Sequence, residues 1–219
     1  MAKAGPRRPE AGERSADTRA ALIAGAVSAL RDAGFAGASA REIARRAGCN
    51  QALVFYHFGT VPDLLLAALD DVSQRRLTAY RGLLDRAGSV TEAVEAARAI
   101  FVEDLAAGHV SVLVEMITGA QSVPGLGEQV ARRLAPWREL TEAAVRQALA
   151  GSPLASLVPA REAAHGIVAG LFGLELLASL DGDPSAALAL FDRALLAAGL
   201  IDLSGGPFPP PGRQEGRTP

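Results

Sequence analysis

The side chains best suited to recognising a partner are concentrated between Gln51 and Thr60, a segment that includes Phe55, Tyr56 and His57. A glutamine side chain can form paired hydrogen bonds with adenine in the major groove of DNA, and an apolar side chain can contact the thymine methyl group. Tyrosine and histidine can donate hydrogen bonds to phosphates, which positions a protein on DNA without reading its sequence. The alternative interpretation is that the aromatic residues are core, since aromatic side chains are mostly buried.

Two short helices joined by a tight turn are predicted to present these side chains. Ser39 and Glu42 have the spacing of a capping box for the first helix. Gly48 should end that helix, because glycine adopts the left-handed conformation at low cost. Asn50 is a good cap for a second helix that begins at Gln51. A helix, a glycine-containing turn and another helix are typical of a DNA-binding helix-turn-helix.

The segment from about Thr18 to Leu69 resembles the N-terminal domain of the TetR family of bacterial transcriptional repressors. The shared features are Ala33-Gly34-Phe35, Ser39, Ile43-Ala44, Ala47-Gly48, Phe55-Tyr56-His57-Phe58 and Asp63-Leu64-Leu65. The family usually has tyrosine at the position of Phe55 and lysine at the position of Val61, so two phosphate contacts are missing here. The resemblance implies a double-stranded DNA operator as partner, contacted by Arg41, Asn50, Gln51, Ala52, Leu53, Phe55, Tyr56, His57 and Thr60.

Composition and charge agree with a folded protein that carries a basic segment. The chain has 219 residues, of which 49 % are hydrophobic, so it can bury a core and is not generally disordered. Residues 1–60 contain nine Lys or Arg and five Asp or Glu, a charge of +4, whereas the whole chain carries −2. A basic DNA-binding domain attached to an acidic second domain would have this charge asymmetry.

A cytoplasmic location is expected. One cysteine excludes an intrachain disulfide, and the N-terminal segment lacks the apolar stretch of a signal peptide. The longest charge-free apolar run, Ala163–Leu174, is shorter than the ~18 residues of a membrane helix, so no membrane partner is expected.

The rest of the chain shows helical periodicity without persistent strand-like alternation, which predicts an all-α fold. We expect a disordered tail over residues 1–16 and a three-helix DNA-binding domain over 17–60. A helical effector-binding and dimerisation domain should cover 61–203, with Pro136 kinking or breaking a helix, and a disordered Pro/Gly-rich tail should follow over 204–219.

The penultimate predicted helix, about 160–180, is apolar almost all round, and a final helix with Leu188, Phe191, Leu195 and Leu196 follows over about 183–203. A helix that is apolar on every side should be buried on every side, and a second subunit is the simplest cover. The resemblance likewise implies a homodimer that reads two half-sites roughly 34–36 Å apart. Glu175, a polar group among apolar ones, is expected to find its partner across this interface. The predicted interface comprises Ile167, Leu171, Phe172, Glu175, Leu188, Phe191 and Leu195.

The resemblance also implies a small-molecule effector held between helices that span about residues 65–149. For each candidate there is an alternative interpretation without a ligand: the apolar residues could belong to the core, and the polar residues could lie on the solvated surface. The candidates are Phe101, His109, Glu115, Met116, Gln121, Trp137 and Arg138.

Catalysis has no support in the sequence. The three histidines are far apart and have no metal-type spacing to Cys49, so no metal, cofactor or enzymatic activity is expected. Two alternatives remain. One is a protein-interaction module whose helix-turn-helix no longer reads DNA, which Phe55 and Val61 favour; the other is a helical enzyme, which would need clustered acid and base residues.

Overall fold

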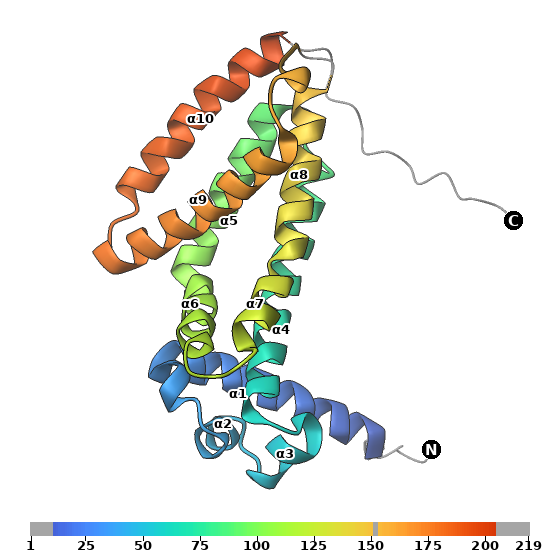
Figure 1. The fold of residues 1–219 in the computed structure, drawn as a ribbon, viewed down its shortest axis with the longest axis vertical. Helices are drawn as coiled ribbons and strands as arrows, with labels where there is room; N and C mark the ends of the chain where they lie inside the picture. Colours follow the sequence, from blue (N-terminus) through green and yellow to red (C-terminus); the bar gives the residue numbers. More distant parts are fainter. Residues whose placement is uncertain (1–10, 151–152, 205–219) are drawn as a thin grey trace, which may run out of the picture. The chain divides into compact units, whose positions relative to one another are not determined.

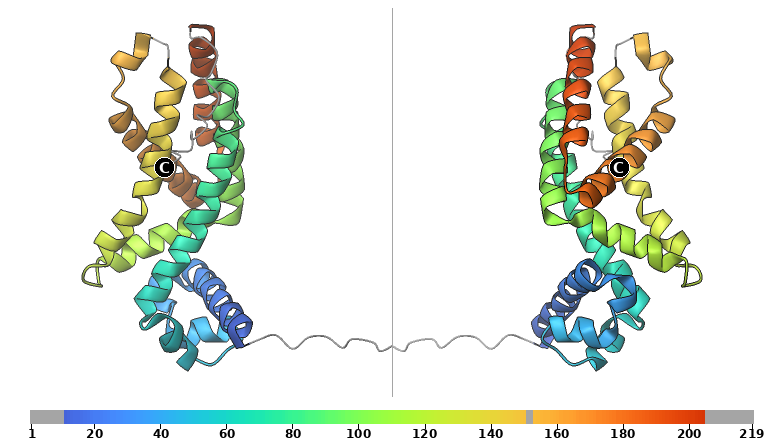
Figure 2. Two further views of the ribbon diagram at one scale, coloured as in Figure 1. Left: turned by 90° about the vertical axis from the view of Figure 1, so that its right-hand side faces the viewer. Right: turned by 90° about the vertical axis from the view of Figure 1, so that its left-hand side faces the viewer.

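The computed structural model describes residues 11–150 and 153–204, and Figures 1 and 2 show the ribbon from three sides. No strand occurs in these residues, which confirms the predicted all-α class. The helices are α1 (Ala11–Gly37), α2 (Ala40–Arg46), α3 (Ala52–Phe58), α4 (Val61–Leu84), α5 (Val90–Ala107), α6 (His109–Ala120), α7 (Leu126–Arg133), α8 (Ala135–Leu149), the short 3-10 helix η1 (Pro153–Ser156), α9 (Ala160–Asp181) and α10 (Ser185–Ser204).

The first helix begins earlier than predicted. Residues 11–16 were expected to be disordered, but they form the first turns of α1. No proline follows Pro9 in this stretch, and alanine and arginine have high helix propensity. The predicted tail at residues 1–10, and residues 205–219 of the C-terminal tail, lie outside the described residues.

Two compact units make up the chain, and their boundary differs from the predicted division at residue 60. Of the described residues, the helix-turn-helix unit comprises 11–72 together with 111–130, and the bundle unit comprises 73–110 together with 131–150 and 153–204. The first turns of α4 and most of α6 belong with the N-terminal helices. One reason is a hydrogen bond from the Phe35 amide to the Glu115 carboxylate, at 2.8 Å.

The core of the helix-turn-helix unit joins α1, α2 and α3. Leu22 and Leu30 from α1, Ile43 from α2 and Val54 from α3 are all fully buried. Gly25 allows α1 and α2 to approach closely, because a Cβ atom there would lie 2.8 Å from the Ile43 carbonyl oxygen.

The bundle unit is formed by the second half of α4 with α5, α8, α9 and α10. α8 packs on α9, and α5 packs on α10. One apolar cluster centres on Phe101 and Phe191, and another centres on Leu77, Trp137 and Val168. The helix break near Pro136 is confirmed, since α7 ends at Arg133 and α8 starts at Ala135.

Among the described residues, two helices have the length and apolar composition needed to cross a membrane, Arg14–Gly37 and Ala160–Asp181. The bent pair α3 and α4 would pass the same test together. The prediction that no apolar segment is long enough for a membrane helix was wrong, because it considered only segments without any charged residue. Within α9, however, Glu175 is buried against Arg76, and Val168 packs in the core of the bundle unit.

Candidate nucleic-acid interface and ligand pocket

Local hydrogen bonds set the start of each helix in the helix-turn-helix. The Ser39 hydroxyl accepts a hydrogen bond from the Glu42 amide at 3.3 Å, and the Asn50 side-chain oxygen accepts one from the Ala52 amide at 2.8 Å. The N-cap position of α3 is Gln51 rather than the predicted Asn50, because the helix begins at Ala52, one residue later than expected, and Asn50 binds the first amide of the helix from the position before the cap. Gly48, in the turn, has a positive φ of 66°, which favours glycine.

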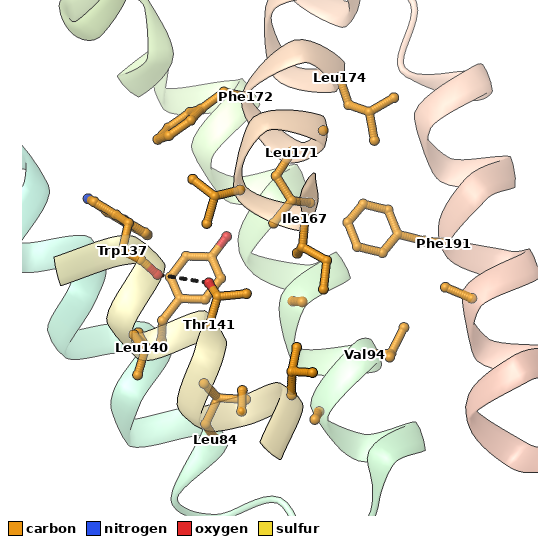
Figure 3. A pocket seen from close by; sticks show the side chains of 18 of the residues that line it. Leu84, Val94, Trp137, Leu140, Thr141, Ile167, Leu171, Phe172, Leu174 and Phe191 are labelled. Atoms are coloured by element: carbon orange, nitrogen blue, oxygen red, sulfur yellow. Dashed lines mark hydrogen bonds between the residues drawn. The ribbon is translucent and has the colours of Figure 1, made fainter. Parts of the chain in front are cut away.

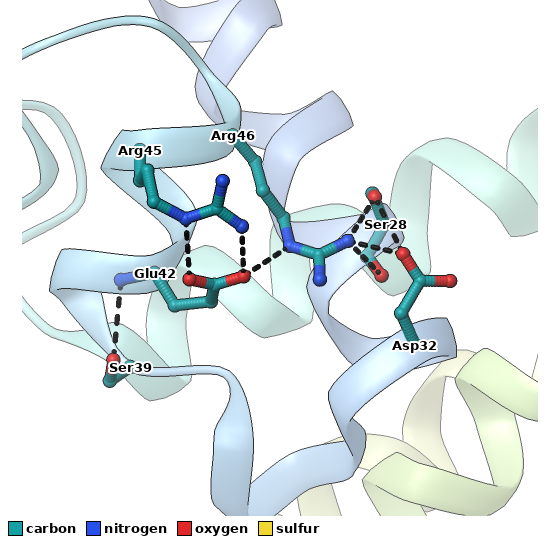
Figure 4. Close-up of polar contacts among 6 residues, drawn as sticks. All are labelled: Ser28, Asp32, Ser39, Glu42, Arg45 and Arg46. Carbon is teal, nitrogen blue, oxygen red and sulfur yellow. Dashed lines mark hydrogen bonds and ion pairs between the residues drawn. The ribbon is translucent and has the colours of Figure 1, made fainter.

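Glu42 completes only half of the predicted capping box. Its carboxylate turns away from the cap and accepts hydrogen bonds from Arg45 at 2.7 and 2.8 Å and from Arg46 at 2.7 Å (Figure 4). These hydrogen bonds, Arg45 first and then Arg46, lower the pKa of Glu42 to about 2. The carboxylate thus stays ionised and is paired with two of the three arginines of α2.

Arg46 joins α2 to α1. Its guanidinium donates hydrogen bonds to the Ser28 carbonyl oxygen at 3.1 Å and to the Ser28 hydroxyl at 2.6 Å, and it pairs with Asp32 (Figure 4). The hydrogen bond from Arg46 also lowers the pKa of Asp32. Of the three arginines on α2, Arg41 is exposed and forms no ion pair with the described residues.

Helix α3 exposes a mixed surface of aromatic and polar side chains. Tyr56 is 79 % exposed and Phe55 is 49 % exposed, so the interpretation of both residues as core is wrong. Val54 is fully buried and anchors the helix. Phe58 is half-buried, with the Arg19 guanidinium 5.1 Å from its ring centre.

The other predicted DNA contacts divide into exposed and partly covered positions. Gln51, Ala52, Asn50 and Thr60 are exposed, whereas Leu53 and His57 are half-buried. The Thr60 hydroxyl donates to the Asp63 carboxylate at 2.6 Å and accepts from the Asp63 amide at 3.2 Å. Thr60 therefore caps α4, and a phosphate contact would have to exchange this pair of hydrogen bonds.

A cavity of about 470 Å³ lies within the bundle unit (Figure 3). Side chains from α4, α5, α8, α9 and α10 line it, and nearly all of them are apolar. Such a volume and lining are typical of sites for small apolar ligands. The side chains labelled in Figure 3 are Leu84, Val94, Trp137, Leu140, Thr141, Ile167, Leu171, Phe172, Leu174 and Phe191.

Trp137 is the one predicted effector residue that lines this cavity. Phe101 is fully buried in the apolar cluster beside it, and Arg138 is exposed. His109 is half-buried with its Nδ1 atom 2.8 Å from Asp104.

The remaining three predicted effector residues belong to the helix-turn-helix unit. Met116 is fully buried, and Gln121 is exposed. Glu115 accepts its hydrogen bond from the Phe35 amide next to Gly34, where φ is 69° and α1 is interrupted. Glu115 is thus bonded to the backbone of the chain and does not line the cavity of the bundle unit.

Most of the residues predicted for the dimer interface line the cavity, namely Ile167, Leu171, Phe172, Glu175 and Phe191. Leu188 and Leu195 are half-buried. Glu175 and Phe191 are buried within the chain, and Glu175 pairs with Arg76 rather than with another subunit. The side chains of α9 and α10 that are exposed and apolar are Ile167, Leu176, Leu177, Leu180, Leu190, Leu196, Leu200 and Leu203.

A buried cluster of charged residues borders the cavity. The Nη2 atom of Arg76 lies 2.9 Å from Oε1 of Glu175 and also pairs with Asp104. The Arg76 guanidinium stacks over Trp137, 5.1 Å from its ring centre. Burial raises the pKa of Glu175 to about 7, against the opposing effect of Arg76.

Sequence reasoning missed Arg76, Asp104 and Tyr80. Arg76 lies four residues from both Val72 and Tyr80, on the apolar face of α4, so a charged residue in an inward position was the available signal. Burial also raises the pKa of the Tyr80 phenol. Among the described residues no group of three or more His, Cys, Asp or Glu side chains could hold a metal ion.

The described residues thus form two units, a helix-turn-helix and a second helical unit that contains a cavity. Residues 22–68 match the family model for bacterial regulatory proteins of the tetR family. The HTH-type transcriptional regulator CymR of Pseudomonas putida is 27 % identical over 131 residues, which cover 58 % of this chain and 63 % of CymR. An uncharacterised HTH-type transcriptional regulator of Mycobacterium tuberculosis is 30 % identical over 117 residues, covering 53 % of this chain and 60 % of the relative.

The likeness in fold extends over more of the chain. The transcriptional regulator FadR from Bacillus subtilis, solved in complex with stearoyl-CoA, has a TM-score of 0.69 at 13 % identity, covering 85 % of this chain and 99 % of FadR. At this identity the comparison shows the fold alone. The chain spans 63 % and 60 % of the length of the two curated relatives. Over residues 22–68 the chain is thus similar to bacterial regulatory proteins of the tetR family.

Proposed function

We propose that this protein is a transcriptional regulator that binds a palindromic DNA operator as a homodimer. It represses in the absence of ligand, and a small apolar effector in the cavity of the bundle unit releases it. It acts in the cytoplasm. FadR of Bacillus subtilis, which has the same fold, was solved in complex with stearoyl-CoA, whose acyl chain is apolar, and this supports an effector with an apolar part here.

The exposed surface of α3 carries the proposal of DNA binding. Tyr56 and Phe55 are exposed on a helix that Val54 holds to the core. Exposed aromatic side chains on a capped helix of a helix-turn-helix are costly unless a partner covers them. Gln51 and Ala52 on the same surface suit an adenine edge and a thymine methyl group.

The exposed leucines of α9 and α10 support the homodimer. Leu196, Leu200 and Leu203 are 65, 69 and 87 % exposed and follow one another at helical spacing along α10. Apolar patches of this kind mark interaction surfaces. A two-fold symmetric dimer would present two copies of α3 to two half-sites.

Selection of bound sequences from a random DNA duplex pool, at two salt concentrations, tests the proposal. The expected result is an enriched palindrome with half-sites about one helical turn apart. Weak binding without enrichment that is lost at moderate salt would leave only phosphate attraction. That outcome would contradict the proposal and favour a helical protein-interaction module.

Gln51→Ala tests base reading by α3. With the enriched operator the substitution should cost about 1–3 kcal/mol of binding free energy and relax specificity at one base position. Gln74→Ala, at an exposed position on α4, is the matched control and should leave binding unchanged. If Gln51→Ala weakened binding to all sequences equally, Gln51 would not read a base.

A further inference from the structure

The cavity of the bundle unit has one polar region, formed by Arg76, Glu175 and the phenol of Tyr80, which interacts with Arg76. The polar side-chain atoms of Trp137 and Thr141, elsewhere in the lining, already have partners. The Trp137 indole nitrogen donates to the Ser73 hydroxyl at 2.7 Å, and the Thr141 hydroxyl donates to the Trp137 carbonyl oxygen at 2.8 Å (Figure 3). A ligand that forms a polar contact in this cavity must therefore form it in the Arg76–Glu175 region.

The Oε2 atom of Glu175 has no hydrogen-bond partner among the described residues. The residue is only 2 % exposed, so water does not readily satisfy this oxygen, and it lines the cavity. Its other oxygen, Oε1, is occupied by Arg76 at 2.9 Å. A buried carboxylate oxygen without a donor is costly, and the cost is removed when a ligand supplies the donor.

The buried cluster also lacks positive charge. Arg76 contributes one positive charge, and its Nη2 atom is shared between Glu175 and Asp104, two carboxylates. His109 contacts Asp104 through Nδ1 at 2.8 Å, so any charge on its ring serves Asp104 and leaves Oε2 of Glu175 without a donor. A ligand carboxylate placed here would add a third negative charge to a single guanidinium.

Aromatic rings line the same cavity. Tyr80 and Phe172 each lie edge-on to Trp137, with ring centres 5.5 and 6.2 Å away. Cations bind favourably over the faces of aromatic rings, and more strongly where water is excluded. The charge deficit, the unpaired oxygen of Glu175 and the rings favour a cationic ligand. The Nε atom of Arg76, which also has no hydrogen-bond partner among the described residues, could donate to an acceptor atom of the same ligand.

We propose that the effector is an apolar amine, or another apolar molecule with a single cationic N–H donor, which donates to Oε2 of Glu175 while its apolar part fills the cavity. This inference rests on the proposed function, in which the cavity holds the effector. Burial, reinforced by Asp104 and opposed by Arg76, raises the pKa of Glu175 to about 7, so the carboxyl is close to taking up a proton near neutral pH. A bound ammonium group would neutralise the Glu175 carboxylate in place of that proton.

Three probes that share one alkyl chain test the proposal, namely n-decylamine, 1-decanol and decanoic acid below their micelle concentrations. Trp137 is the only tryptophan in the chain and lines the cavity, so its fluorescence reports binding without a label. Decylamine should bind at least about tenfold more tightly than decanol or decanoate, since a charge-assisted hydrogen bond in a buried site is strong. Equal or tighter binding of decanoate would overturn the proposal.

Glu175→Gln identifies the group responsible, because it removes the charge and keeps the shape. The advantage of decylamine over decanol should fall about tenfold or more, while decanol affinity stays within about twofold. Thr141→Val, also in the lining, should leave the preference for the amine unchanged. An amine preference that survives Glu175→Gln would overturn the assignment. If this variant does not fold, the ranking of the three probes on the unmodified protein still decides.

Binding to the cavity is measured without DNA, so the two proposals can fail separately. Absence of decylamine binding, with an enriched operator, would overturn the ligand class and leave DNA binding intact. Decylamine binding without release of the operator would support the ligand class and contradict the proposed effector role of the cavity.

Discussion

The Nη2 atom of Arg76 lies 2.9 Å from Oε1 of Glu175, although the two residues are 99 positions apart in the chain. Both side chains are buried, and Asp104 is the third member of the cluster. Removing charges from water is costly, so each member of such a cluster depends on the others. The same cluster borders the cavity, which links the stability of the bundle unit to its ligand chemistry.

Arg76→Met should destabilise the bundle unit by about 3–5 kcal/mol, because it leaves two buried carboxylates without their counterion. Urea unfolding followed by Trp137 fluorescence measures this loss. Arg81→Met, at an exposed position on the same helix, should change the free energy of unfolding by less than about 0.5 kcal/mol. If Arg76→Met lowered the free energy of unfolding by less than about 1 kcal/mol, the two carboxylates would not depend on Arg76 as their counterion.

The stability of the bundle unit should depend on the protonation of Glu175. Its pKa is raised from 4.5 to about 7 in the folded protein by burial, with Arg76 opposing and Asp104 reinforcing the shift. A carboxyl whose folded pKa is raised binds its proton more tightly when folded. Its contribution is therefore fully present below pH 4.5 and is lost as the pH rises through about 7.

Glu175→Gln should abolish this part of the pH dependence. The difference in unfolding free energy between the two proteins should change by on the order of 1–3 kcal/mol across the window. Urea unfolding at several pH values provides the measurement. Parallel profiles for the unmodified protein and the variant would show that Glu175 does not titrate there.

Gly25→Ala should destabilise the helix-turn-helix unit by about 1–3 kcal/mol, since the new Cβ would clash with the Ile43 carbonyl at 2.8 Å. Gly82→Ala is the matched control, because a Cβ there meets only the end of the Arg86 side chain at 3.5 Å. That control should be neutral or stabilising by up to about 1 kcal/mol. Thermal unfolding followed by circular dichroism compares the two, and equal effects would contradict the close approach of α1 and α2.

The double substitution Leu196→Glu and Leu200→Glu should convert a dimer into a monomer. Both side chains are exposed on α10, and a buried unpaired carboxylate in an apolar interface is costly. Leu157→Glu, at a position that is 75 % exposed before α9, should leave the dimer intact. Sedimentation equilibrium measures the mass, and an unchanged dimer would exclude this face of α10 as the interface.

Local signals in the sequence predicted the helix-turn-helix well. The side-chain hydrogen bonds of Ser39 and Asn50 and the turn at Gly48 involve contacts and dihedral angles within a few residues. The same holds for the break near Pro136 and for the capping of α4 by Thr60. These features depend on neighbouring residues alone, so the sequence was sufficient to place α2, α3 and their exposed residues.

The tertiary structure decided which partner each polar and apolar side chain takes. Arg41 and Arg46 are both arginines of α2, yet Arg46 bonds to Ser28 and Asp32 on α1, whereas Arg41 is exposed. Glu175 was expected to bond across a dimer and instead pairs with Arg76 within the chain. Local sequence determines where helices begin and end because those hydrogen bonds are short-range. Which face of an apolar helix is buried, and where a cavity remains, depends on packing between residues about a hundred positions apart, which no local pattern encodes.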